Sequence, residues 1–514
     1  MMTASPPCTV LVIGAGIMGT GIGQVAAQAG HEVRLFDTRD DAATEAKTKL
    51  GTGLAALAAK GKVPADTVAA TLARIQPIAA LEQSRDAGLV IEAIVENLDA
   101  KRTLLRQIEG LVGADCMLAS NTSSISITAL ANGLQRPERL VGMHFFNPAP
   151  VMKLVEVVSG LHTAPAVAKA AFTFAERWGK TPVHARSTPG FIVNRIARPY
   201  YGEAQALLHE RAATPPVLDV CLRAVGFRMG PCELIDLVGQ DVNLAVTESV
   251  YQANFGDKRY MPSLLQREMV EGGLLGRKSG RGFYDYRNGV PAAPAPVLTE
   301  GEPVAVPSAA LVFVHGKGPV AEHWAQALGS AGVFFDRKRA SDWSGLEADG
   351  AQLRVTDGRS ATRVSAETGV REIALMDLPI APFAAGAALA FSVARTASPT
   401  WADHAPAWLR LAGFTPHRVG DAAGLIAART IAMLINEAAD AVQQGVCSEE
   451  AADTAMKLGL NFPAGPFEWL SRWDVGNVVQ LLDYLDEEYR GERYRVSPEL
   501  RERAWCAAVV DGRR

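Results

Sequence analysis

The sequence predicts an α/β domain at the N-terminus, an all-α domain after it, and then a shortened second copy of both. Residues 9–37 place a branched apolar strand, a glycine-rich turn, a helix-compatible stretch and a second strand in direct succession, which is typical of a parallel sheet. Residues 188–208 recur as residues 422–442, 234 positions later, which indicates an internal repeat. Between these segments, residues 287–308 are rich in Pro and Ala and favour a linker.

Composition places the chain among globular proteins. It has 514 residues, 48% apolar and 21% charged, which predicts about three or four domains. The net charge of −4 gives no reason to expect a nucleic-acid or membrane partner. We see no apolar run long enough to span a membrane and no signal peptide. The cysteines show no CxxC spacing, so we expect reduced thiols, no metal site and a cytoplasmic protein: Cys8, Cys116, Cys221, Cys232, Cys447 and Cys506.

The turn GAGIMG has the context of a dinucleotide-binding loop in a Rossmann-type domain. Gly14 permits the tight turn, Gly16 lets the backbone approach a pyrophosphate, and Gly19 allows close packing of the helix on the strand. Asp37 ends the second strand, 18 residues after Gly19, where a carboxylate accepts from ribose hydroxyls and favours NAD over NADP. We therefore expect NAD to contact this acid and the loop residues Gly14, Gly16, Ile17, Met18 and Gly19.

Two further strands end beside polar residues. A buried strand over residues 88–93 is followed by Glu96 and Lys101, and a strand over residues 117–119 leads into SNTSS at 120–124. Because ligands bind beyond the carboxyl ends of strands in open α/β sheets, the serine-rich turn is a candidate ligand contact. A helix cap before Ile125 explains the same composition, so both interpretations stay open.

An acid lies within an apolar strand later in the chain. In KLVEVV, over residues 153–158, Glu156 stands among Leu and Val, where an unpaired carboxylate costs several kcal/mol. His144 lies twelve positions earlier. Either Glu156 points to water at an edge, or it pairs with His144, which as an imidazole near neutral pH is suited to act as a base.

Six motifs together resemble the NAD-dependent 3-hydroxyacyl-CoA dehydrogenases. The likeness covers residues 9–286 and is greatest to the long members linked to phenylacetate breakdown, which act on 3-hydroxyadipyl-CoA. It implies NAD-dependent oxidation of an (S)-3-hydroxyacyl-CoA to the 3-oxoacyl-CoA. The motifs are GAGIMG with Asp37, IEAIVENL (91–98), ASNTSSI (119–125), HFFNPAPVMKLVEVV (144–158), TPGFIVNR (188–195) and GRKSGRGFYDY (276–286).

The resemblance also implies roles for individual residues. His144 is then the catalytic base and Glu156 its partner, as the acid is in a hydrolase triad. Ser123 and Asn194 contact the reacting oxygen, where donors stabilise developing charge. Glu96 and Lys101 then lie beside the nicotinamide end of the cofactor, and Asn121 in the serine-rich turn is a further cofactor contact.

The second copy keeps the pattern and lacks the chemistry. Residues 310–336 read as strand, glycine turn, helix and a strand ending in Asp336, 299 positions after Asp37. Since the later offset is 234, about 65 residues are missing from the second α/β region. The turn HGKG has no GxGxxG, no HFFNP follows, and Ala428 replaces Asn194, so we expect neither NAD binding nor catalysis. The acid is absent too, because Ala390 matches Glu156.

These observations divide the chain into five parts. We expect a Rossmann-type NAD-binding domain over residues 6–186, a helical domain over 187–288, a linker over 289–308, a degenerate shortened Rossmann-like region over 309–419 and a second helical domain over 420–505. Helical domains of this family commonly pair between chains. Two assemblies therefore stay open: a homo-oligomer, and a chain in which the second copy replaces one dimer contact.

Substrate contacts are less defined. Lys60 and Lys62 lie where the family places part of its CoA contact, although a solvated lysine pair explains them equally well. Arg198, four residues after Asn194, lies on the same face if one helix spans both, and it is a candidate for a distal carboxylate; a structural arginine meeting Glu203 is the alternative. Pro199 limits that helix. A free hydroxy acid or sugar acid, or 3-hydroxybutyryl-CoA, are alternative substrates, and a non-catalytic protein of the same fold is the remaining alternative.

Overall fold

The computed structural model describes residues 8–289, 308–380 and 383–510. The expected linker over 289–308 therefore lies almost wholly outside the described residues. Contacts divide the chain into two compact units, one of residues 1–195 with 441–460 and the other of residues 196–440 with 461–514. Within the described ranges, no helix is both long and apolar enough to cross a membrane.

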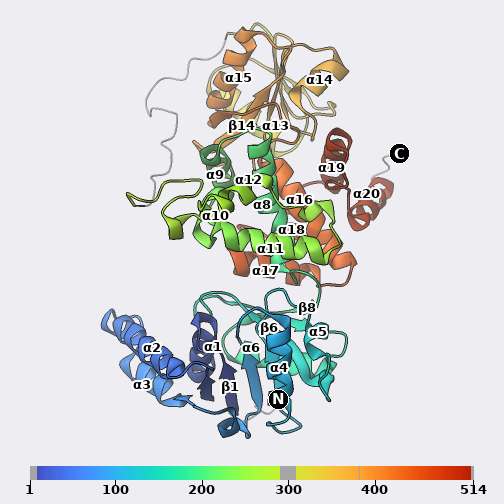
Figure 1. The fold of residues 1–514 in the computed structure, drawn as a ribbon. Helices are drawn as coiled ribbons and strands as arrows, with labels where there is room; N and C mark the ends of the chain where they lie inside the picture. The colour runs from blue at the N-terminus through green and yellow to red at the C-terminus, as the bar shows by residue number, and fades with distance from the viewer. Residues whose placement is uncertain (1–7, 290–307, 381–382, 511–514) are drawn as a thin grey trace. The chain divides into compact units, whose positions relative to one another are not determined.

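The first unit contains an eight-stranded sheet in the order β3-β2-β1-β4-β5-β6-β7-β8 (Figure 1). All neighbours run parallel except β6 and β7, which are antiparallel. Its strands are short and mostly buried, as parallel strands covered by helices are. They are β1 (Thr9–Ile13), β2 (Glu32–Phe36), β3 (Ile75–Pro77), β4 (Leu89–Glu92), β5 (Met117–Ser120), β6 (Leu140–Phe145), β7 (Leu154–Ser159) and β8 (Thr181–Arg186).

Helices pack on this sheet and build one hydrophobic core. Alternate residues of a strand face opposite sides, and Val10 and Val12 join the core cluster that also contains Ile22 of α1 and Ala171 of α6. Asn97 caps α4 by accepting from the amide of Ala100. The helices are α1 (Ile17–Gln28), α2 (Ala42–Ala59), α3 (Ala65–Arg74), α4 (Leu98–Glu109), α5 (Ile127–Ala131), α6 (Pro165–Arg177), α7 (Val193–Ile196) and, from far along the chain, α17 (Glu449–Leu460).

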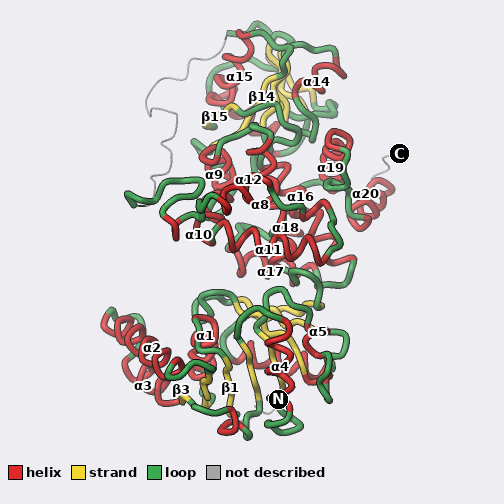
Figure 2. The backbone as a smooth tube through the Cα atoms, viewed as in Figure 1, coloured by secondary structure: helices red, strands yellow, loops and turns green. Residues whose placement is uncertain are grey.

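The second unit holds most helices of both copies and a second sheet (Figure 2). The first copy contributes α8 (Arg198–His209), α9 (Pro215–Ala224), α10 (Pro231–Val238), α11 (Gln240–Ala253) and α12 (Leu264–Glu271). The second contributes α16 (Ala427–Gln443), α18 (Pro466–Arg472), α19 (Val475–Tyr489) and α20 (Pro498–Val510). The expected order of an α/β region, a helical region, a reduced sheet and further helices is confirmed.

The second sheet is shorter by one strand and runs in the order β10-β9-β11-β12-β13-β14-β15. An Asp349-Gly350 hairpin joins β11 to β12, with both residues at positive φ, so this part of the sheet is antiparallel. The strands are β9 (Val312–His315), β10 (Asp336–Lys338), β11 (Gly345–Ala348), β12 (Ala351–Val355), β13 (Ile373–Met376), β14 (Ala388–Val393) and β15 (Thr415–Arg418), with helices α13 (Pro319–Ser330), α14 (Ala361–Thr368) and α15 (Pro399–Leu411).

One expectation for this region is wrong. Asp336 begins β10 instead of ending it. Gly316 donates its amide to Lys338, as Gly14 does to Phe36 in the first sheet. Arg339, the residue after Lys338, therefore stands where Asp37 stands, because strand register and not the acid fixes the correspondence.

The two helical copies meet through matched buried carboxylates. Glu203 of the first copy accepts from Arg429, at 2.7 Å, and from Arg493, at 2.8 Å, and neither Glu203 nor Arg429 is exposed. In the reverse sense, Glu437 accepts from Arg259 at 3.1 Å and from the Tyr260 hydroxyl at 2.5 Å. The two carboxylates are equivalent in the repeat, so the contact has the self-matching pattern of a twofold interface inside one chain.

Candidate active site

His144 and Glu156 face each other across β6 and β7. The antiparallel register pairs the two residues directly. The Nδ1 atom of His144 lies 2.5 Å from Oε2 of Glu156, and both side chains are buried. Because an ionised carboxylate only accepts, Nδ1 donates, and Nε2 is the nitrogen that can take a proton. The edge interpretation of Glu156 is therefore wrong, and its burial is compensated by hydrogen bonds.

Glu156 also holds the chain that leads into α7. Its Oε1 atom accepts from the amides of Ile192, at 3.0 Å, and Val193, at 2.9 Å. These amides begin a helix, where backbone N–H groups have no helical partner and attract a carboxylate. One carboxylate thus binds the histidine with one oxygen and the start of α7 with the other.

Asp377 gives the second copy the same helix contact without the histidine. It lies directly after β13, and its amide donates to Ala390, the residue that matches Glu156. Asp377 therefore occupies the strand position of His144. Its carboxylate accepts from the amides of Ile426 and Ala428, at 3.0 and 2.9 Å, at the start of α16. The sequence prediction overlooked this acid, although a lone Asp after the apolar run IALM is the same signal that Glu156 gives.

The glycine loop has the shape that a dinucleotide requires. Gly14 has φ +102°, and a Cβ there would lie 2.6 Å from the carbonyl oxygen of Ala93. A Cβ on Gly19 would meet the Gly14 carbonyl oxygen at 1.8 Å. Around Gly16 there is nothing within 4 Å of a Cβ, so the loop is open where a pyrophosphate would approach the start of α1. The loop residues therefore fit NAD, which when bound supplies the hydride acceptor.

Asp37 lies at the end of β2 beside this loop. Its Oδ2 accepts from the Ala15 amide at 2.8 Å, and its Oδ1 accepts from the Arg39 amide at 3.0 Å. Partial burial opposes ionisation, but these hydrogen bonds and the Arg39 charge together lower the pKa of Asp37. The group is therefore a carboxylate at neutral pH, as an acceptor for ribose hydroxyls must be.

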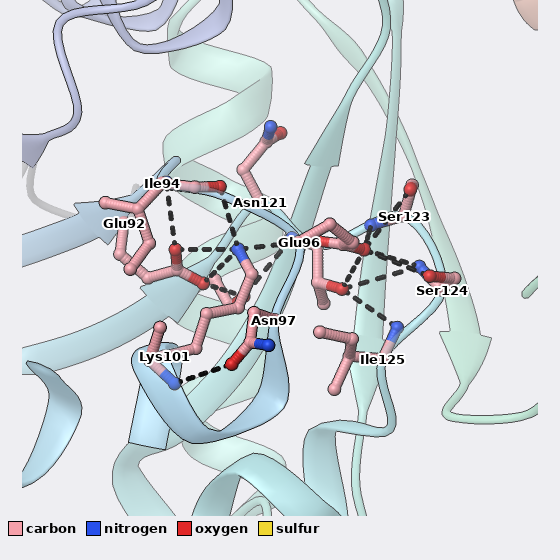
Figure 3. A network of polar contacts seen from close by, with 12 residues as sticks. Glu92, Ile94, Glu96, Asn97, Lys101, Asn121, Ser123, Ser124 and Ile125 are labelled. Carbon is pink, nitrogen blue, oxygen red and sulfur yellow. Dashed lines mark hydrogen bonds and ion pairs between the residues drawn. The ribbon is translucent and has the colours of Figure 1, made fainter. Parts of the chain in front are cut away.

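Glu96 organises the serine-rich turn after β5 (Figure 3). Its Oε1 accepts from the Ser123 amide, at 2.9 Å, and the Ser124 amide, at 3.1 Å, and from both serine hydroxyls and that of Thr122. Burial raises the pKa of Glu96, but the charge of Lys101 and these hydrogen bonds outweigh it, so the pKa is lowered. The N-cap of α5 is Ser126. The serine-rich turn over residues 120–124 therefore does not cap a helix.

Lys101 is anchored by an acid that the sequence prediction missed. Its ammonium group lies 2.8 Å from Glu92 and 3.4 Å from Glu96, and the Lys101 side chain is 1% exposed (Figure 3). Glu92 is fully buried at the end of β4 and also accepts from the Ser120 hydroxyl. Glu92 thus links the ends of two neighbouring strands, β4 and β5. The available signal was again an acid closing an apolar strand, LVIE.

The remaining predicted residues lie in several places. Asn121 accepts from the Phe145 amide at 2.9 Å, which joins the serine-rich turn to the strand of His144. Asn194 follows Val193 in α7, next to the amides that Glu156 binds. Lys60 and Lys62 are exposed at the turn after α2.

Arg198 departs from the expected helix. Asn194 lies in α7 and Arg198 begins α8, so one helix does not span both residues. The guanidinium of Arg198 is buried and donates to the Thr247 hydroxyl at 3.1 Å. Glu203, the alternative partner, accepts from Arg429 and Arg493.

Comparisons with known proteins identify the family of the chain. Residues 9–188 match the 3-hydroxyacyl-CoA dehydrogenase NAD binding domain, and residues 190–286 and 424–505 match the C-terminal domain of the same family. Residues 353–422 match the 3-hydroxybutyryl-CoA dehydrogenase reduced Rossmann-fold domain.

Some relatives match nearly the whole chain, and others match about half of it. The 3-hydroxyadipyl-CoA dehydrogenase of Escherichia coli K12 is 42% identical over 96% of this chain and 97% of its own. A 3-hydroxybutyryl-CoA dehydrogenase of Clostridioides difficile is 39% identical over 54% of this chain and 98% of its own. A crystal structure of an E. coli 3-hydroxybutyryl-CoA dehydrogenase has a TM-score of 0.88 at 40% identity and covers 98% of this chain and 100% of its own. The chain belongs to the 3-hydroxyacyl-CoA dehydrogenase family and is an NAD-dependent oxidoreductase.

Proposed function

We propose that His144 is the base that removes the hydroxyl proton when a 3-hydroxyacyl-CoA is oxidised to the 3-oxoacyl-CoA. The supporting observation is the direct pairing of His144 with Glu156, which leaves Nε2 to take the proton. The alcohol then loses its proton to His144 and its hydride to bound NAD. The carboxylate of Glu156 orients the ring and stabilises the imidazolium that forms.

Ser123 and Asn194 are proposed to contact the reacting oxygen. Ser123 lies beyond the carboxyl end of β5, and the neighbouring strand β6 carries His144. Donors at that point stabilise the charge that develops on the oxygen. In the structure the Ser123 hydroxyl donates its single proton to Glu96 at 3.3 Å, so it turns from Glu96 to the reacting oxygen when substrate binds. Glu96, Lys101 and Asn121 then support the nicotinamide end of the cofactor.

The substrate is proposed to be 3-hydroxyadipyl-CoA, in aromatic catabolism by the phenylacetate route, with 3-hydroxybutyryl-CoA as the second candidate. The relative with 42% identity is named for the first compound, and the solved structure with TM-score 0.88 is named for the second. A dicarboxylic acyl group needs a cation at the far end of its pocket, and we assign this contact to Arg198. In Arg198→Leu, kcat/KM should fall more for 3-hydroxyadipyl-CoA than for 3-hydroxybutyryl-CoA, and equal losses would reject the assignment.

One assay tests the reaction itself. NADH formation is measured with a panel of 3-hydroxyacyl-CoAs that differ in chain length and terminal charge, with NADP as control. Turnover of a thioester, with His144→Ala inactive, supports the proposal. Oxidation of free hydroxy acids or sugar acids without any thioester turnover would assign the site to the alternative substrates.

Lys60 and Lys62 are proposed to guide the CoA phosphates, because both are exposed where helices α2 and α3 meet. Replacing both with Ala should raise KM for acyl-CoA and weaken its dependence on salt, with kcat unchanged. An unchanged KM would leave them as solvated lysines.

We propose that pairing of the helical copies inside the chain replaces a contact between chains, in a cytoplasmic protein with the five-part division given above. The buried ion pairs of Glu203 and Glu437 and the free state of the cysteines support this. Removal of residues 300–514 should expose the apolar face of the first copy and cause aggregation or dimerisation. A stable, active, monomeric fragment of residues 1–290 would contradict the pairing.

A further inference from the structure

Helix α17 belongs to the second helical copy but packs on the NAD-binding sheet. It contacts β7 and β8 of that sheet. Its buried residues follow helical spacing on one face: Ala452, Ala455, Met456 and Gly459. At Gly459 the approach is close, because a Cβ there would lie 3.0 Å from side-chain atoms of both Leu154 and Val193.

Hydrogen bonds fix the segment that leads into α17. The Arg186 amide donates to the Val446 carbonyl at 2.8 Å, and the Arg186 guanidinium donates to the Gln444 carbonyl at 3.0 Å. The arrangement is reciprocal, since the Gly420 amide donates to the Ala212 carbonyl at 2.7 Å and α9 packs on β14. Each helical copy therefore supplies one helix to the sheet of the other copy.

The two residues that Gly459 approaches bear directly on the catalytic pair. Leu154 lies two positions before Glu156 on β7, so the two side chains share a face of the sheet. Val193 donates its amide to Glu156 at 2.9 Å. Burial and the charge of Glu156 raise the pKa of the thiol of Cys447, the second residue before α17, to about 12.

We propose that α17 is a positioning element for catalysis: the copy without catalytic residues of its own holds Glu156, and through it His144, by packing against Leu154 and Val193. This inference rests on the proposed role of His144. It gives the second copy a purpose beyond pairing, because the catalytic pair is completed by residues some 300 positions further along the chain. The absence of a side chain at position 459 is what allows the close approach.

Substitution of Gly459 in the full-length enzyme tests the proposal. Gly459→Ala and Gly459→Val add groups that must push Val193 and Leu154, and we expect kcat to fall about threefold in the first and about 10- to 100-fold in the second. The pH dependence of oxidation should shift, because the imidazolium loses contact with its counter-charge. Gly329 is the control, since it lies in helix α13 with nothing within 4 Å of its Cβ. Gly329→Ala and Gly329→Val should leave kcat and its pH profile as in the wild type.

A compensating change and a measurement without substrate make the test specific. Val193→Ala added to Gly459→Ala should restore part of kcat and move the pH profile back toward that of the wild type, because the smaller side chain removes one of the two close contacts of the new methyl group. NMR titration of the His144 ring reports the same displacement even if no thioester is oxidised, which separates this proposal from that of the substrate. Unchanged kcat and titration in both Gly459 variants would overturn it. A loss of kcat with an unchanged pH profile and no rescue by Val193→Ala would also overturn the proposal. If Gly459→Val fails to fold, the result for Gly459→Ala decides the test.

Discussion

The Oε2 atom of Glu156 lies 2.5 Å from Nδ1 of His144, while the Oε1 atom of the same carboxylate accepts two backbone amides at the start of α7. One side chain therefore joins His144 to the point where the NAD-binding domain continues into the helices. The second copy retains the helix contact in Asp377. The two functions of Glu156 can consequently be tested separately within one chain.

Glu156→Gln should fold and lose at least about 100-fold in kcat. The glutamine amide keeps an oxygen for the α7 amides but cannot stabilise the imidazolium as a carboxylate does. The pH profile of oxidation should shift as well. Steady-state kinetics from pH 6 to 10 measure both effects, and near-normal activity with an unchanged profile would remove Glu156 from the mechanism.

Asp377→Asn is the matched control for that substitution. It weakens the equivalent helix contact in a copy that has no histidine at this place, so the melting temperature should fall while kcat per folded molecule stays within about twofold. A large loss of kcat in folded Asp377→Asn would show that the two copies are not separable in this way.

Ser123 and Ser124 form a pair for testing the oxygen contact. Both hydroxyls donate to Glu96, at 3.3 and 3.1 Å, but of these two serines the family resemblance gives contact with the reacting oxygen only to Ser123. Ser123→Ala should lower kcat by about 100-fold, as loss of one donor to a developing oxyanion does, and Ser124→Ala should change it less than about threefold. Equal effects in the two variants would make the turn a structural feature only.

Asp37 should determine the choice of cofactor. Asp37→Ala removes the acceptor for ribose hydroxyls and the repulsion of a 2′-phosphate, and it leaves the Arg39 guanidinium available. KM for NAD should rise about tenfold or more, as expected for a lost charged hydrogen bond, and kcat/KM for NADP should increase. Assays with both cofactors measure the change, and an unaltered ratio of the two kcat/KM values would exclude this role.

Breaking the buried pair of Glu203 and Arg429 should be costly. Arg429→Met leaves the carboxylate of Glu203 without one partner, and loss of one member of a buried pair lowers stability by about 3–5 kcal/mol. Burial raises the pKa of Glu203, but the charges of Arg493 and Arg429 outweigh it and lower the pKa, so Glu203 stays ionised. Urea unfolding with sedimentation should show lower stability and new association between chains. A variant with the stability and the association state of the wild type would contradict the internal pairing.

The raised pKa of Asp219 predicts that the stability of the fold changes with pH in one direction. Burial raises its pKa to about 7, although the Tyr284 hydroxyl and the Cys232 amide donate to it. Unfolded aspartate titrates near pH 4, so between about pH 4 and 7 the folded state holds more protons and stability falls as the pH rises. Asp219→Asn should remove this part of the slope. Unfolding free energies at pH 4, 5.5 and 7 test this, and parallel curves for the two proteins would contradict it.

Local patterns were enough to predict the first elements of the chain and several later strands. The strand over residues 9–13 and the helix that begins within GAGIMG follow from branched apolar residues and from glycines, whose effects act over a few positions. The repeat was visible because Gly190, Arg195 and Glu203 recur at a single offset. The correspondence of Asp336 with Asp37 failed because strand register depends on pairing partners, which a single segment does not reveal.

By itself the sequence determined the family and the cofactor, because GAGIMG, Asp37 and the motifs that contain His144 and Glu156 have local spacing. Only the tertiary structure decided what surrounds them. Lys101 meets Glu92, Arg429 meets Glu203 and Gly459 meets Val193 through folding of distant segments. Buried charges and close backbone approaches depend on which groups the fold brings within a few ångströms, and no short stretch of sequence specifies those partners.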